Sequence, residues 1–128
     1  MGRDEIFETI REVLVDALAV DDDEVTADAT IMADLGAESI DILDIQFKLE
    51  QAFGFKIAQG EMFPEGVMQD PDYVKDGLIT DKGLEELKTK MPHFDFSKLK
   101  GDRTVTAIGG IFTVDTLVSF CEQKLQAA

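Results

Sequence analysis

The stretch that decides the fold is DLGAESIDILDI, residues 34–45. Gly36 permits a sharp turn, and apolar residues at helical spacing begin directly after Ser39. A hydroxyl is therefore predicted at the start of a helix, with carboxylates on both sides of it. The acidic residues along this region are Asp34, Glu38, Asp41, Asp44 and Glu50.

The predicted helix begins at Ser39 or Ile40 and ends near Phe53, with Gly54 as its C-cap. Its apolar stripe is wider than one packing face requires. The stripe consists of Ile40, Ile42, Leu43, Ile45, Phe47, Leu49 and Phe53. Part of this stripe is therefore expected in the core, and part is available for another role.

Two further long helices are predicted, over residues 3–19 and 114–126, with Thr113 as the N-cap of the second. A shorter helix is predicted over residues 80–91, ended by Pro92. Residues 70–77 and 95–101 are expected to form a turn or two each. Residues 104–112, TVTAIGGIF, are compatible with a short strand or a loop, because their β-branched residues and their glycine pair point in different directions.

Composition and charge limit the function classes. The 128 residues are 45% apolar, enough for one domain with its own core. A net charge of −15 repels phosphate backbones, which argues against nucleic-acid binding and favours partners with basic patches. The single cysteine, Cys121, fits a reducing compartment. No apolar run reaches the length of a membrane span, and the acidic N-terminus does not resemble a signal peptide, so a cytoplasmic protein is expected.

Ser39 considered by itself allows two interpretations. A serine nucleophile needs a base, and the sole histidine, His93, is distant in sequence. The residues LGAESI do not form a G-x-S-x-G elbow, which argues against a hydrolase. As an isolated serine, Ser39 is more readily interpreted as the N-cap of the helix that follows.

Taken together, Asp34, Leu35, Gly36, Ser39 and Ile40 resemble the phosphopantetheine attachment site of acyl carrier proteins. The resemblance continues through DILDIQFKLEQAFGFKI, residues 41–57, and covers about residues 3–57 and 112–126. Glu38 and Ile40 stand where the family usually has Asp and Leu. The segment at about 58–112 is far longer than in ordinary carriers. Specialised carriers for unusual or very long acyl chains, such as those serving lipid A assembly, are similar in having an extended middle.

The resemblance implies an all-α, acyl-carrier-like bundle with three main helices, in a single domain over 1–128 whose expanded segment at about 58–112 adds short helices. It implies that Ser39 carries covalent 4′-phosphopantetheine and that Gly36 forms the turn before it. The implied roles of the other residues are partner recognition by Asp34, Glu38, Asp41, Asp44 and Glu50, and an acyl pocket lined by Ile40, Leu43, Phe47 and Leu49. The expanded segment contains aromatic and methionine residues, among them Phe63 and Met68. These residues either enlarge or cover the acyl site, or they only fill the core of a larger domain.

The implied protein is a carrier rather than an enzyme, and a monomer is expected. Its implied partners are a phosphopantetheinyl transferase, chain-elongating and acyl-transferring enzymes with basic docking patches, and the acyl chains of fatty acid or lipid biosynthesis. A peptidyl carrier of a nonribosomal synthetase and an unmodified acidic helical adaptor are the alternatives.

Three other signals point to no additional site. The acidic run at 21–34 lacks the Gly and Glu that an EF-hand loop requires at its sixth and twelfth positions, where Thr26 and Met32 stand. Cys121 has core spacing, which predicts a buried, inert thiol. His93 follows a proline at a helix end and is predicted at the surface or in a cap, without neighbouring metal ligands.

Overall fold

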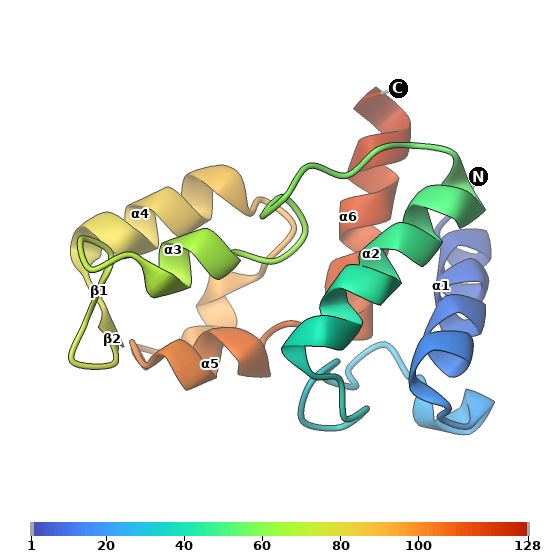
Figure 1. The fold of residues 1–128 in the computed structure, drawn as a ribbon, viewed down its shortest axis with the longest axis horizontal. Helices are drawn as coiled ribbons and strands as arrows, with labels where there is room; N and C mark the ends of the chain where they lie inside the picture. The colour runs from blue at the N-terminus through green and yellow to red at the C-terminus, as the bar shows by residue number, and fades with distance from the viewer. Residues whose placement is uncertain (1, 128) are drawn as a thin grey trace.

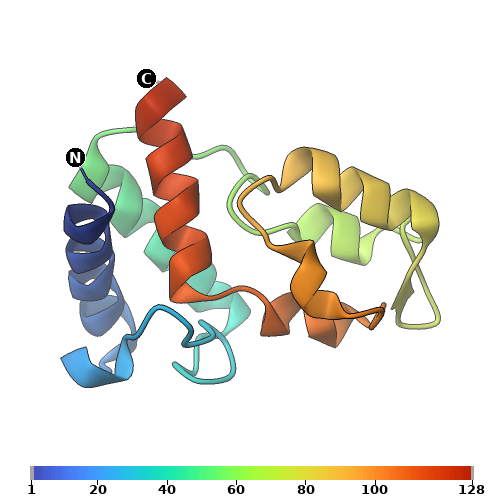
Figure 2. The ribbon, with the colours of Figure 1, turned by 180° about the vertical axis from the view of Figure 1, so that it is seen from behind.

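The computed structural model of the chain describes residues 2–127, and Figure 1 shows two groups of elements side by side. Helices α1 (Arg3–Leu18), α2 (Ser39–Phe53) and α6 (Val114–Ala127) form a bundle at one end. The elements of the middle segment, residues 58–112, lie at the other end. The view from behind shows the same division, with α6 beside both groups (Figure 2). The predicted all-α architecture with three main helices is confirmed.

The three long helices follow the periodicity of their sequences closely. Helix α1 buries one stripe against α2 and α6, made of Ile6, Ile10, Val13 and Leu14. Helix α2 ends at Gly54, whose φ of 79° places it in the left-handed region that terminates helices. Helix α6 begins after Thr113, whose Oγ1 accepts a hydrogen bond from the Thr116 N–H at 3.2 Å. The predicted bounds and caps of these helices are therefore confirmed to within a residue or two.

The long polar connection between α1 and α2 is an ordered crossover. It contains a 3₁₀ turn, η1 (Asp22–Glu24), and then pairs with the chain just before α6. The Ile31 N–H donates to the Phe112 carbonyl at 3.0 Å, and the Val114 N–H donates to the Ala29 carbonyl at 3.0 Å. These hydrogen bonds fix the position from which α2 starts.

The middle segment contains six short elements: α3 (Glu65–Gln69), β1 (Val74–Lys75), β2 (Leu78–Ile79), α4 (Asp81–Lys90), η2 (Phe96–Leu99) and α5 (Val105–Gly110). Strands β1 and β2 form an antiparallel hairpin, with Asp76 and Gly77 at its turn. Both turn residues have positive φ, 55° and 77°, as tight hairpin turns require. Thr80 caps α4, because its side chain accepts a hydrogen bond from the Gly83 N–H at 3.0 Å.

Both interpretations of residues 104–112 are wrong, because α5 is a helix. The side chain of Thr104 accepts a hydrogen bond from the Ala107 N–H at 3.3 Å and so caps the first turn. Ile108 is completely buried. The cap and the tertiary packing of Ile108 outweigh the low helix propensity of the β-branched residues and glycines.

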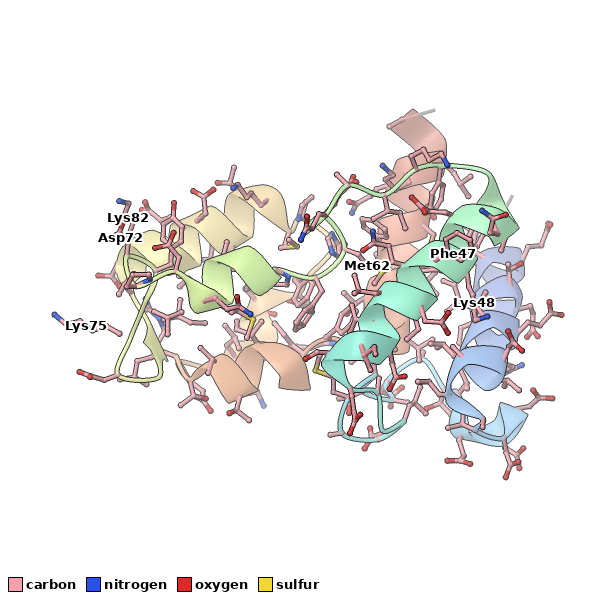
Figure 3. All side chains as sticks on the ribbon, viewed as in Figure 1. Phe47, Lys48, Met62, Asp72, Lys75 and Lys82 are labelled. Carbon is pink, nitrogen blue, oxygen red and sulfur yellow. The ribbon has the colours of Figure 1, made fainter. Side chains whose placement is uncertain are left out.

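An aromatic cluster joins the middle segment to the bundle. The Phe94 and Phe112 rings stack with centroids 5.6 Å apart, and the Phe63 ring lies 4.9 Å from that of Phe112. Met62 is fully buried at the junction between the two groups of elements (Figure 3). At the surface of the same junction, Lys124 of α6 forms an ion pair with Glu61 at 3.0 Å. The hydrophobic core is therefore continuous from the bundle into the middle segment.

The prediction that His93 lies at the surface is wrong. The residue is 7% exposed, its ring centroid lies 4.8 Å from that of Phe120 on α6, and its Nε2 is 2.9 Å from the Met62 carbonyl oxygen. Tertiary packing of the segment after α4 against α6 buries this ring. Within residues 2–127, none of the helices has the length and apolar character needed to cross a membrane.

Candidate functional site

Ser39 lies in the first turn of α2, and its side chain is exposed. The N-cap is the preceding residue, Glu38, which has extended backbone angles and accepts hydrogen bonds at its carbonyl from Asp41 and Ile42. The interpretation of Ser39 as the N-cap is therefore wrong. The Asp41 carboxylate accepts from the Glu38 N–H at 2.8 Å, so the helix is held closed from residue 38 onward without the serine hydroxyl.

The turn before Ser39 is held by paired hydrogen bonds. The Thr30 N–H donates to the Asp34 carboxylate, and the Asp34 N–H donates to Thr30 Oγ1, both at 2.9 Å. Gly36 has a φ of 76°, a conformation that disfavours any side chain. Leu35 and Ala37 are buried on either side of it. The turn is thus pinned to the core and presents Ser39 outward.

The five acidic residues named for partner recognition differ in their environments. Asp34, Glu38 and Asp44 are exposed, whereas Asp41 and Glu50 are half-buried. Glu50 accepts a hydrogen bond from the Ile57 N–H at 2.7 Å and so ties the exit of α2 back to the helix. Asp41 and Glu50 therefore have a clear structural role, and the exposed charge near Ser39 comes from the other three.

A groove of about 780 Å³ opens beside Ser39. Besides Ser39, its lining consists of Met32, Ala33, Ile40, Leu43, Phe63, Met68, Gln69, Val105, Thr106, Gly109 and Gly110. Most of this lining is apolar, and the volume lies within the range of small-molecule sites. Four separate parts of the chain contribute: the connection before α2, the start of α2, α3 with the residues before it, and α5.

Of the four residues named for the acyl pocket, the structure places Ile40 and Leu43 on the groove. Leu49 is fully buried in the core of the bundle, and Phe47 is 60% exposed and does not line the groove. Figure 3 shows Phe47 on α2. Sequence reasoning singled out Phe63 and Met68 but missed Met32, Val105 and the glycines of α5, because no local pattern connects segments so distant in sequence.

His93 and Cys121 have no part in this groove. His93 lines a different cavity, beside Phe120 and Lys124, and burial lowers the pKa of its ring. The structure therefore does not bring His93 and Ser39 together as a catalytic pair. Cys121 is buried, and burial raises the pKa of its thiol to about 12, which makes it unreactive at neutral pH, as predicted.

Comparisons with known proteins identify the segment of the chain that contains Ser39. A family model described as a phosphopantetheine attachment site matches residues 8–64, which include most of α1 and all of α2 with Ser39. An acyl carrier protein of Petrotoga mobilis is 44% identical over 62 residues, which are 48% of this chain and 73% of that relative. The chain belongs to the acyl carrier protein family.

Two other acyl carrier proteins are also similar to the chain. That of Rubrobacter xylanophilus is 43% identical over 61 residues, covering 48% of this chain and 75% of the relative. That of Coprothermobacter proteolyticus is 28% identical over 81 residues, covering 62% of this chain and 99% of the relative. No solved structure matches the chain. The family match ends at residue 64, so α3, the hairpin, α4 and α5 lie outside it.

The cofactor of acyl carrier proteins is covalent 4′-phosphopantetheine, and the residues present here fit it. When bound, the group supplies a terminal thiol that holds acyl groups as thioesters. Ser39 is an exposed hydroxyl in the first turn of a 15-residue helix. The N-terminal end of such a helix carries about half a positive charge, which favours a phosphodiester anion there. Members of the family are carriers and not catalysts, which argues against both the hydrolase and the unmodified adaptor.

Proposed function

We propose that Ser39 is the residue to which phosphopantetheine is attached, by a separate phosphopantetheinyl transferase. The observation that carries the proposal is the position of Ser39, which is exposed in the first turn of α2, inside the matched segment and on the rim of an apolar groove. Gly36 and the Thr30–Asp34 pair support it, because they fix the turn that presents the hydroxyl.

The test is the intact mass of the protein after incubation with coenzyme A and a transferase of broad specificity. The wild-type chain is expected to gain one phosphopantetheine, and Ser39→Ala none. Because Ser39 is exposed, the Ala variant should unfold at the same temperature as the wild type, so that a missing arm reflects a missing acceptor. Addition of the arm to Ser39→Ala would overturn the proposal.

The exposed acids around Ser39 support recognition by enzymes with basic docking patches. Asp34, Glu38 and Asp44 leave their charge at the surface near the attachment point. Ion pairs at a surface speed encounter more than they tighten binding. Such contacts suit a carrier, which must dock with a loading or accepting enzyme and then leave it. The carboxylates of Asp41 and Glu50 add to the same negative electrostatic potential. They also accept hydrogen bonds from backbone N–H groups.

The groove beside Ser39 supports a role as the acyl site. Ile40 is 73% exposed and Leu43 is 58% exposed, so that apolar surface lies open to a ligand next to Ser39. Burial of a methylene group contributes roughly 0.8 kcal/mol, so an acyl chain gains by leaving water for this groove. The proposed cargo is therefore an apolar acyl group, such as those of fatty acid or lipid biosynthesis.

We further infer that residues 1–128 act as one carrier domain. The continuous core and the Glu61–Lys124 ion pair support this, because they hold the middle segment against α6. A cytoplasmic, monomeric protein stays a prediction from composition.

A further inference from the structure

The groove beside Ser39 has two walls of different origin. One wall consists of Ile40 and Leu43 at the start of α2, within the family match. The opposite wall includes Met68 on α3 and Val105 on α5, both beyond residue 64, where the match ends. Part of the site next to the attachment serine is therefore built by a segment that the family pattern does not include.

The interior of the three-helix bundle is filled by side chains. Ile10 of α1, Ile45 of α2 and Leu117 of α6 are each completely buried. An acyl chain could enter this space only by displacing well-packed residues, which is costly in a core at native density. The groove offers about 780 Å³ without such displacement.

The chemistry of the groove indicates an uncharged, apolar occupant. Phe63, Met68 and Val105 line the groove together with Ile40 and Leu43, and methionine adapts readily to ligands of different length. Because Ser39 itself lines the groove, a chain carried on its arm is delivered to this surface.

We propose that α3 and α5 form the outer wall of the acyl site, so that a long, unbranched acyl chain lies between α2 and the middle segment and not inside the three-helix bundle. Met68 and Phe63 then limit the length of chain that the carrier can shelter. This inference rests on the proposed attachment of the arm to Ser39.

The first experiment measures thermal unfolding of the protein loaded with acyl arms of increasing length. Mass spectrometry first confirms that each arm is attached; if none attaches, the proposed function fails and not this inference. In the wild type, the unfolding temperature is expected to rise with chain length until the groove is filled, and then to stay constant.

The variant Met68→Trp narrows the groove, so its unfolding temperature should stop rising at a shorter acyl chain. Leu78→Trp, at an exposed apolar position on the hairpin that does not line the groove, is the matched control and should behave as the wild type. The same plateau in Met68→Trp as in the wild type would overturn the inference.

The second experiment needs no variant. The wild-type carrier is loaded with a long acyl chain bearing a photoreactive diazirine at its far end, irradiated, and digested with trypsin. Cleavage after Lys56 and Lys75 releases residues 57–75, the peptide that contains Phe63, Met68 and Gln69. Cross-links at these residues, or at Val105 and Thr106, are expected. Cross-links confined to α1 and the inner face of α6, or reaction with solvent alone, would overturn the inference.

Discussion

The N–H of Glu38 donates a hydrogen bond to the carboxylate of Asp41 at 2.8 Å, and these two acids bracket Ser39. The carboxylates around the serine therefore have two functions. Asp41 closes the first turn of α2, so the hydroxyl of Ser39 is not needed as a helix cap. Glu38, together with Asp34 and Asp44, leaves its charge at the surface.

Removal of the Asp41 cap should lower the stability of the protein and loosen the turn that presents Ser39. Asp41→Ala leaves the Glu38 N–H without its partner and is expected to destabilise the protein by about 1 kcal/mol. Addition of the arm to Ser39 should also slow, since the turn loosens. Urea unfolding and initial rates of arm addition measure the two effects. Asp44→Ala is the control for stability, because Asp44 has only a 3.9 Å contact with Lys48 and should change stability by less than ~0.5 kcal/mol. Equal destabilisation by both variants would contradict the role of Asp41.

The exposed acids should act on encounter rates. The pair Glu38→Gln and Asp44→Asn is expected to lower the rate of arm addition about threefold or more at low ionic strength, with little effect at high salt. The pair Asp4→Asn and Glu5→Gln removes the same charge at the start of α1, at the opposite end of the bundle (Figure 1), and should slow the reaction far less. Equal slowing by both pairs would show that only net charge matters.

Helix α4 packs closely against the residues before the hairpin, and this close packing should require a glycine at position 83. A Cβ at Gly83 would clash with the Tyr73 carbonyl oxygen, so Gly83→Ala is expected to destabilise by ~1–3 kcal/mol despite the better helix propensity of alanine. Gly66→Ala in α3 meets nothing within 4 Å and should be neutral or stabilise by up to ~1 kcal/mol. Chemical denaturation of both variants provides the measurement. A stabilising Gly83→Ala would show that the two segments are not in contact.

Acid should destabilise the protein through His93. Burial lowers the pKa of this ring from its ordinary 6.5, so the unfolded chain binds its proton at a higher pH than the folded chain does. Folding stability is therefore expected to fall as the pH drops through 6.5, by at most about 1.4 kcal/mol per pH unit. His93→Gln keeps a donor for the Met62 carbonyl but does not titrate. Urea unfolding at about pH 7.5 and about pH 5.5 should show a larger loss in the wild type than in this variant. Equal losses would mean that His93 does not titrate differently in the two states.

The long helices could be predicted because their information is local. The spacing of Ile6, Ile10 and Leu14 defines the buried face of α1, and Gly54 marks the end of α2 by its ability to adopt positive φ. Thr80 and Thr113 act as caps through hydroxyls adjacent to the helices that they begin. Ser39, the proposed attachment residue, could be singled out for the same reason, since turn, hydroxyl and helix lie within a few residues.

The remaining features depend on contacts between distant segments. Helix α5 forms although its sequence favours a strand or a loop, because Thr104 caps it and Ile108 is buried. His93 is buried only because the chain after α4 packs on Phe120. The groove brings Met32 to Gly109, whose added Cβ would lie 3.6 Å from the Met32 sulfur. No periodicity within one segment could reveal these pairings.

The attachment of the arm to Ser39 is tested most directly by locating the added mass within the modified protein. Trypsin cleavage after Arg11 and Lys48 yields residues 12–48, a peptide with three hydroxyl side chains, Thr26, Thr30 and Ser39. Fragmentation of this peptide from protein treated with coenzyme A and a transferase should place phosphopantetheine on Ser39 alone. An arm on Thr26 or Thr30, or an unmodified peptide after complete reaction of a known carrier in the same tube, would contradict the account.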